Sequence, residues 1–236
     1  MIYQADFITD SIDTSELYSN MGVKIHGAAM GLIKRDYARL LHRSDYHPFS
    51  IFTVPADDRI IIRISALNKE THCIIEGFCK SETLTIYGVG EICIAKQSEA
   101  PPIDAAAAGE FIAGSNCRMV FASPAMFKSG GKICCFPEVE RYFYSVISKY
   151  NKFENAALSY EEFCAAFAEG QTGDYQLKRT GYNVSGNIFW GMTGYIDYRF
   201  PKETRHRELL KKVFAYASYC GVGGKTSMGM GGFIIS

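Results

Sequence analysis

The order of predicted strands and helices constrains the fold of this 236-residue chain more than any other feature. In the first half, runs rich in β-branched and aromatic residues predict four strands, at residues 2–9, 48–54, 59–67 and 84–94. Two helices are predicted between them, at residues 19–35 and 70–79. The resulting order is β-α-β-β-α-β.

The second half repeats this order. Its strands are predicted at residues 118–122, 175–182, 187–200 and 232–235. Its helices are predicted at residues 137–150, with Pro137 in the first turn, and 203–219, and a short helix at 159–169 is inserted. Because β-α-β-β-α-β is the ferredoxin-like unit, we expect an α+β fold of two tandem ferredoxin-like (RRM-like) domains. We place them at residues 1–115 and 116–236.

Composition indicates a folded chain that does not span a membrane. Hydrophobic residues make up 47% of the sequence, which provides for a core, yet no apolar run approaches the length of a membrane span. The first residues lack a signal-peptide layout, so we expect a cytoplasmic protein. Eight cysteines occur without a Cys-x-x-Cys pair, which favours reduced thiols and argues against a zinc site.

Charge is unevenly distributed although the net charge is zero. Residues 176–236 contain nine Lys or Arg side chains and three acidic ones, so the preceding residues carry the balancing negative charge. Such an asymmetry indicates an anionic partner near the basic end. The alternative is an ordinary solvated helix face.

A glycine-rich stretch at residues 221–231 lies between the last predicted helix and the last predicted strand. It contains two Gly-apolar-Gly triplets, with Lys225 between them. A nucleotide P-loop would need glycine where Tyr219 stands, and a dinucleotide loop would need glycine where Thr226 stands. A nucleotide-binding enzyme is therefore a remote alternative, and the lysine suggests a grip on another phosphate-bearing ligand.

This stretch resembles the signature of CRISPR-associated endoribonucleases that process precursor CRISPR RNA, members of the repeat-associated mysterious protein superfamily. Three further segments are similar to parts of that family: residues 121–127 (FASPAMF), residues 191–195 (GMTGY), and Leu41-His42 followed by Pro48-Phe49-Ser50. The resemblance covers most of the chain and is most specific in the glycine signature. It also implies tandem ferredoxin-like domains.

The resemblance implies a metal-independent endoribonuclease that cleaves precursor CRISPR RNA within its repeats. The 2′-OH would attack the phosphorus, leaving a 5′-OH and a 2′,3′-cyclic phosphate or 3′-phosphate. No cofactor is expected; the expected partner is CRISPR repeat RNA, and a homodimer or other effector-complex subunits are compatible partners. The alternative is a non-catalytic RNA-binding scaffold subunit of a CRISPR effector complex, favoured if the two best histidines lie more than about 10 Å apart or if one is buried in a core.

Histidine suits both the acid and the base of this reaction, because its pKa lies near neutrality. The resemblance points first to His42, just before the Pro-Phe strand, and then to His26 on the first helix. His47 is the alternative if the register differs, and Tyr37 could assist. His72 is expected to be structural, and His206 to contact RNA.

The resemblance also implies that RNA is held by the second domain. Lys225 is expected to contact phosphate, with Thr226 and Ser227 as further donors. Lys178, Arg179 and Arg199 lie on predicted strands that could form a basic hairpin, the alternative being exposed solubilising charge. The glycines expected to shape the RNA-binding loop are Gly221, Gly223, Gly229 and Gly231.

Overall fold

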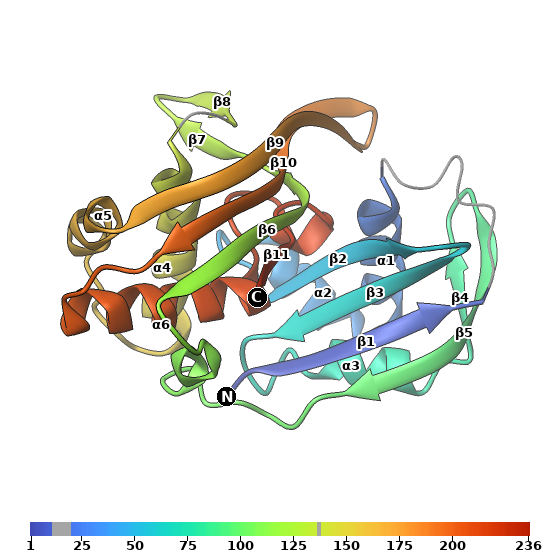
Figure 1. Cartoon of the computed structure of the whole chain (residues 1–236). Coiled ribbons are helices and arrows are strands. Elements are labelled where there is room, and N and C mark those ends of the chain that lie inside the picture. The colour runs from blue at the N-terminus through green and yellow to red at the C-terminus, as the bar shows by residue number, and fades with distance from the viewer. Residues whose placement is uncertain (11–19, 136–137) are drawn as a thin grey trace.

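The computed structural model describes residues 1–10, 20–135 and 138–236 of the chain. Within the first half of these residues the strands form one five-stranded sheet, all neighbours being antiparallel. The strands follow the order β2 (Phe49–Ala56), β3 (Arg59–Ala66), β1 (Tyr3–Thr9), β5 (Gly90–Glu99) and β4 (Thr83–Ile86). Helices α1 (Met21–Leu32), α2 (Arg35–His42) and α3 (Cys73–Cys79) lie behind this sheet in Figure 1.

The described part of the second half forms a four-stranded antiparallel sheet. Its order is β11 (Phe233–Ile235), β6 (Asn116–Ala125), β10 (Asn187–Arg199) and β9 (Gln171–Val184). Helices α4 (Tyr142–Phe153), α5 (Tyr160–Glu169) and α6 (Thr204–Cys220) complete this half (Figure 1). Strand β4 is an additional edge strand that pairs with β5. Without it, the four strands of each half lie in the spatial order fourth, first, third and second, which is the order of a β-α-β-β-α-β unit. The predicted tandem ferredoxin-like fold is therefore confirmed.

Alternating burial explains why the strands form where the sequence predicts them. In β1 the side chains of Ala5, Phe7 and Thr9 are buried, and their neighbours are only partly so. Helix α4 buries a stripe that includes Phe143, Val146 and Ile147, at the spacing of one helical face. Each sheet and its helices enclose an apolar cluster, and the cluster of the second sheet also takes in Ile2 and Leu67 from the first half.

Several element boundaries differ from the sequence prediction. Residues beyond Leu32 do not continue the first helix, because Ile33 is extended and a separate helix, α2, follows. The helix predicted at 137–150 is a 3₁₀ turn at Val139–Arg141 followed by α4, and Pro137 lies outside the described residues. Strand β6 continues through Pro124 to Ala125, and a hairpin of β7 (Phe127–Ser129) and β8 (Lys132–Cys134) follows it.

The segment that joins the two halves lies against α6. A 3₁₀ turn at Ala108–Phe111 brings Gly109 against the backbone of Lys211 and Lys212, where a Cβ atom would come within 2.9 Å of a backbone nitrogen. The linker between the two halves is therefore packed against the last helix. The domain boundary between residues 115 and 116 stays a prediction. In the described part of the chain, no helix is long and apolar enough to cross a bilayer.

Candidate active site

The segment 221–231, which we call the glycine loop, is held by hydrogen bonds to the last residues of β6 and to the residue that follows it. The backbone N–H groups of Gly224 and Gly231 donate to the carbonyls of Met126 and Pro124, at 2.8 and 2.9 Å. Just beyond the loop, the N–H of Gly232 donates to Oγ of Ser123 at 2.7 Å. Residues 121–127 and 221–231, both singled out in the sequence, are therefore one structural unit.

The glycine loop is largely buried between the two halves. Thr226 and Ser227 are 5% and 1% exposed, whereas Gly224 and Lys225 are partly exposed. The short 3₁₀ turn that these hydroxyl residues form, η3 (Thr226–Met228), packs against α1 and β2. The structure thus places the two hydroxyl residues in an internal contact, not on an open RNA-facing surface.

Gly229 and Gly22 allow this contact between the loop and α1. A Cβ atom on Gly22 would lie 2.3 Å from Cα of Gly229, which is too close for any side chain. Gly229 has a φ of 95°, a conformation that favours glycine. The hydroxyl of Tyr182 in β9 donates to the carbonyl of Met228 at 3.0 Å and closes the loop from the other side.

His26 connects α1 to the loop. Its Nδ1 is 3.0 Å from the carbonyl oxygen of Ser227. Because a carbonyl oxygen only accepts, Nδ1 carries the hydrogen and Nε2 of the neutral ring keeps its lone pair. No hydrogen bond from a described residue occupies that Nε2. Burial lowers the pKa of His26, and the neighbouring His42 lowers it further against the opposing effect of the Ser227 carbonyl, so the neutral ring dominates near pH 7.

His42 is the last residue of α2 and is exposed. Its ring centroid lies 5.9 Å from that of His26, with an edge-to-face angle of 66°. His26 is buried, with 7% of its surface exposed, and its ring stacks on that of Phe49 at a centroid distance of 5.9 Å, at the junction with the loop. The two histidines that were expected to act together therefore share one site.

His47 lies in the segment between α2 and β2, and its ring meets that of Phe49 edge-on at 5.7 Å. Its Nδ1 is buried without a hydrogen-bond partner among the described residues. Burial lowers the pKa of His47 to about 4, and the charges of His26 and Lys149 lower it in the same direction. A neutral His47 therefore borders the site near pH 7.

Lys149 is a residue of this region that the sequence did not single out. It lies on the buried stripe of α4 and is 4% exposed. Its Nζ donates to the carbonyl of Cys220 at 2.7 Å and to Oγ1 of Thr226 at 2.6 Å. The signal in the sequence was its place three residues after Val146 and seven after Tyr142, on the helix face that the apolar residues define.

A cavity of about 630 Å³ opens beside His47, Lys149 and the glycine loop. Basic and aromatic side chains border it, among them Lys128, Arg141, Tyr46, Tyr144, Tyr160 and Lys225. Nζ of Lys225 also lies 4.6 Å from the ring centroid of Phe189 in β10, a cation–π contact. Positive charge with aromatic surface is suited to a nucleotide backbone and its bases.

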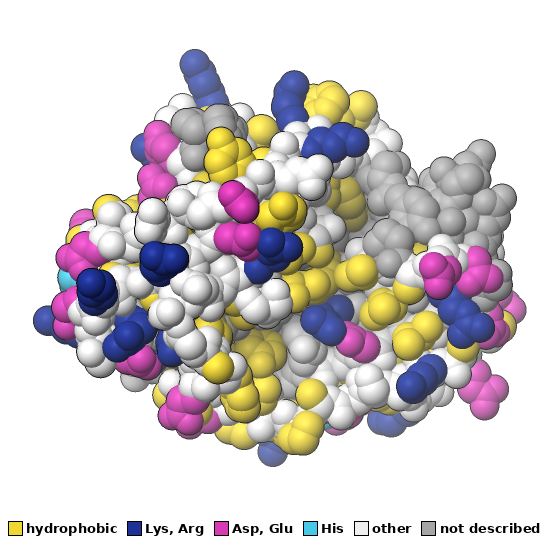
Figure 2. All heavy atoms as spheres, viewed as in Figure 1, with side chains coloured by type: hydrophobic (Ala, Val, Ile, Leu, Met, Phe, Trp, Pro, Cys, Tyr) yellow, Lys and Arg dark blue, Asp and Glu magenta, His cyan; other side chains and the backbone are white. Residues whose placement is uncertain are grey.

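The three remaining basic candidates are exposed on the β9–β10 hairpin. Lys178 and Arg179 lie in the middle of β9, and the guanidinium of Arg179 lies 4.2 Å from the ring centroid of Trp190. Arg199 pairs with Gln171 at the end of the hairpin far from its turn. Figure 2 shows dark blue side chains standing out over the β7–β8 and β9–β10 region.

Tyr37 has its own partner within the first half. Its hydroxyl is 2.9 Å from Oγ1 of Thr71, beside α3, and its ring packs against the core of that half. The hydroxyl of Tyr37 is thus hydrogen-bonded to Thr71 within the first half, whereas His26 is hydrogen-bonded to the glycine loop.

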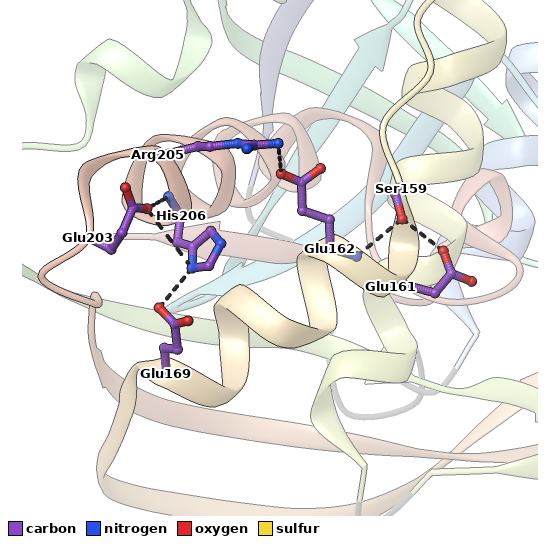
Figure 3. A network of polar contacts seen from close by, with 7 residues as sticks. All are labelled: Ser159, Glu161, Glu162, Glu169, Glu203, Arg205 and His206. Atoms are coloured by element: carbon purple, nitrogen blue, oxygen red, sulfur yellow. Dashed lines mark hydrogen bonds and ion pairs between the residues drawn. The ribbon is translucent and has the colours of Figure 1, made fainter.

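The two other histidines take part in surface networks. Nε2 of His72 is 2.7 Å from a carboxylate oxygen of Glu99. His206 lies in the first turn of α6, where its Nδ1 is 2.7 Å from a carboxylate oxygen of Glu169 at the end of α5, and Arg205 pairs with Glu162 nearby (Figure 3). Its hydrogen bond to Glu169 raises the pKa of His206. These contacts join helices to each other and give His206 a role within the fold.

Metal ligands do not converge at this site or elsewhere in the described ranges. Within residues 1–10, 20–135 and 138–236, no three His, Cys, Asp or Glu side chains form a group that could hold a metal ion.

The profile of the family described as CRISPR-associated endoribonuclease Cas6 matches residues 119–233, which include the glycine loop and the segment that holds it. A CRISPR-associated endoribonuclease Cas6 from Streptococcus thermophilus is 23% identical over 226 residues, covering 90% of each chain. The chain is thus similar to CRISPR-associated endoribonucleases of the Cas6 family over most of its length. Two solved Cas6 structures show the same fold. One, described as a product complex, superposes with a TM-score of 0.81 at 17% identity, with all of both chains covered. The other, Thermus thermophilus Cas6, has a TM-score of 0.73 at 17% identity and covers 100% of this chain and 98% of its own.

Proposed function

We propose that this chain is a metal-independent endoribonuclease that cleaves CRISPR repeat RNA. The observation that carries the proposal is the pairing of His26 and His42, whose rings lie 5.9 Å apart beside the glycine loop. The relatives are named as CRISPR-associated endoribonucleases, and such an RNA is their expected substrate class.

In the proposed reaction, Nε2 of neutral His26 accepts the proton of the substrate's 2′-OH. The 2′-oxygen attacks the adjacent phosphorus in line, and the bond from phosphorus to the 5′-oxygen breaks. His42, in its protonated form, gives its proton to that leaving oxygen. The products are a 2′,3′-cyclic phosphate and a 5′-OH, and two positioned imidazoles of this kind contribute roughly 10²–10⁴-fold each.

RNA would be held by the exposed cations around the junction. Lys225 reaches from the loop toward the hairpin, and Lys178 and Arg179 extend the positive surface along β9. Four glycines of the loop have φ values between 67° and 95°, and we propose that they allow its backbone to turn: Gly221, Gly223, Gly229 and Gly231. Thr226 and Ser227 would set the positions of Lys149 and His26 in place of direct contacts to RNA.

The non-catalytic scaffold is the less favoured alternative. The two histidines lie within the distance that a shared reaction requires, and the relatives found are named as endoribonucleases. A homodimer and a role beside other effector subunits are compatible with this proposal and follow from the resemblance alone.

The test is cleavage of the host's own repeat RNA in the presence of EDTA. We expect site-specific cutting by the wild type and a loss of about 10²–10⁴-fold in the single-turnover rate for His42→Ala and for His26→Ala. His72→Ala, which changes a histidine remote from the loop, is the matched control and should cut like the wild type. Intact RNA at high enzyme concentration, or full activity of both variants, would refute the proposal.

A further inference from the structure

The buried ammonium of Lys149 is the strongest unexplained feature of the junction. Lysine is rarely fully buried, because desolvation is costly unless each N–H group finds an acceptor. Here the side chain is 4% exposed and donates to the carbonyl of Cys220 and to Oγ1 of Thr226. Those acceptors are the last residue of α6 and the first residue of η3, so Lys149 ties together the two ends of the turn that contains Lys225.

A continuous set of contacts leads from Lys149 to His26. Thr226, which accepts from Lys149 at 2.6 Å, is followed directly by Ser227, whose carbonyl accepts from Nδ1 of His26 at 3.0 Å. Helix α4 belongs to the second half of the chain and α1 to the first. Lys149 on one side of the junction therefore bonds the side chain of the residue directly before the one whose carbonyl contacts an imidazole on the other side.

We infer that Lys149 is a positioning residue, which holds the Thr226–Ser227 backbone so that the Ser227 carbonyl keeps the hydrogen of His26 on Nδ1. The inference rests on the proposed function, because it gives the free Nε2 of His26 its use as a base. Outer partners that fix a ring tautomer in this way are often worth about 10–100-fold in activity.

Protonation of Lys149 does not change this role. Burial lowers the pKa of its amine. The ammonium has three N–H groups and the neutral amine has two, and two acceptors are present. Both hydrogen bonds can therefore form in either protonation state.

The experiment measures the tautomer of His26 directly. The imidazole ¹⁵N spectrum of the RNA-free protein is recorded above the pKa of His26, with the His26 signals assigned by their loss in His26→Gln. For the wild type we expect the hydrogen on Nδ1. For Lys149→Met we expect a mixture of both tautomers, and a single-turnover cleavage rate lower by about 10–100-fold with RNA affinity within about threefold of the wild type.

Two further variants keep the test decisive if Lys149→Met does not fold. Thr226→Val removes the hydroxyl that Lys149 contacts and should shift the tautomer in the same direction, whereas Thr226→Ser retains it and should behave as the wild type. Lys152→Met makes the same chemical change at an exposed position of α4 and should leave the tautomer unchanged.

A wild-type tautomer in Lys149→Met and Thr226→Val would overturn the inference. So would a loss of rate in Lys149→Met that is matched by the loss of RNA affinity, because that pattern indicates a purely structural lysine. Since the spectrum needs no RNA, a wild type that fails to cut any repeat refutes the proposed function and still leaves the tautomer result to decide the role of Lys149.

Discussion

The glycine loop and the β9–β10 hairpin were both expected to grip RNA, and they differ sharply in exposure. The loop turns its hydroxyl residues inward, with Ser227 1% exposed, and leaves Lys225 at its rim. The hairpin presents Lys178 and Arg179 to solvent on a long edge strand. The glycine signature therefore serves first to join α1 closely to the second half, and the hairpin supplies the accessible charge.

This difference separates two kinds of change. A substitution in the loop acts on the geometry of His26 and so on the rate of cleavage. A substitution in the hairpin acts on phosphate contacts and so on affinity and its salt dependence.

The contact between Gly22 and Gly229 gives the largest effect. An added Cβ in Gly22→Ala would lie 2.3 Å from backbone, so α1 must move away from the loop. We expect a cleavage rate lower by about 100-fold or more, because a misplacement of about 1 Å has that cost, and a loss of about 1–3 kcal/mol in the free energy of unfolding. Single-turnover kinetics and denaturant unfolding measure the two.

Gly27→Ala is the matched control on the same helix. A Cβ atom there meets nothing within 4 Å. Alanine favours a helix over glycine by up to about 1 kcal/mol, so this variant should be at least as stable as the wild type and equally active. Equal activity of Gly22→Ala and Gly27→Ala would show that the loop contact does not govern the site.

Neutralising the hairpin gives a smaller effect of a different kind. The double variant Lys178→Gln, Arg179→Gln should weaken RNA binding by about tenfold at low salt and reduce the slope of log K against log salt by about 2. The cleavage rate of bound RNA should change little, because neither side chain touches the histidines. Filter binding across a salt series tests this, with Lys80→Gln, an exposed lysine beside α3, as control. An unchanged salt slope would remove the hairpin from the RNA surface.

The lowered pKa of His47, beside the glycine loop, predicts that the stability of the protein depends on pH. Its pKa is about 4 in the folded chain against 6.5 for a free imidazole, so between these values the unfolded chain binds the proton and the folded chain does not. Stability should therefore fall as the pH drops from 6.5 to 4. We expect a loss of about 1–2 kcal/mol, discounted for partial exposure of the ring. Urea unfolding of the wild type and of His47→Gln measures this loss. The same dependence of stability on pH in both proteins would contradict a partly buried, neutral His47 ring.

Arg199→Gln is expected to have the smallest effect. Arg199 lies at the end of the hairpin far from its turn, and its neighbours there are Gln171 and Asn116. RNA affinity should change by less than about twofold, as is usual for a solvated surface charge distant from the phosphates. A loss as large as that for the hairpin double variant would extend the RNA surface along the whole hairpin.

Strand order and the glycine motif could be predicted because they depend on local patterns. Alternating apolar residues predicted strands in both sheets. The short helix predicted at residues 159–169 is α5, and the Oγ of Ser159 caps it by accepting from the N–H of Glu162 at 3.1 Å. Helix α2 was missed, because Ala38 and Leu41 are its only buried residues and a short polar helix carries little periodic signal.

The roles of Thr226, Ser227 and Lys149 could not be predicted in the same way. A hydroxyl between glycines looks alike whether it faces a phosphate or a lysine of its own chain. A lysine within a helix is normally solvated, and only the packing of α4 against the glycine loop shows that Lys149 is an internal donor. Contacts between residues 77 positions apart have no local signature.

The most direct test of the central claim uses a repeat RNA with a single 2′-deoxy nucleotide at the mapped cleavage position. If His26 takes the proton of the 2′-OH and that oxygen is the nucleophile, the substituted RNA should bind with unchanged affinity and remain uncut in EDTA. The unmodified RNA should give a 5′-OH and a 2′,3′-cyclic phosphate. Cleavage of the deoxy RNA at the same position would contradict the account.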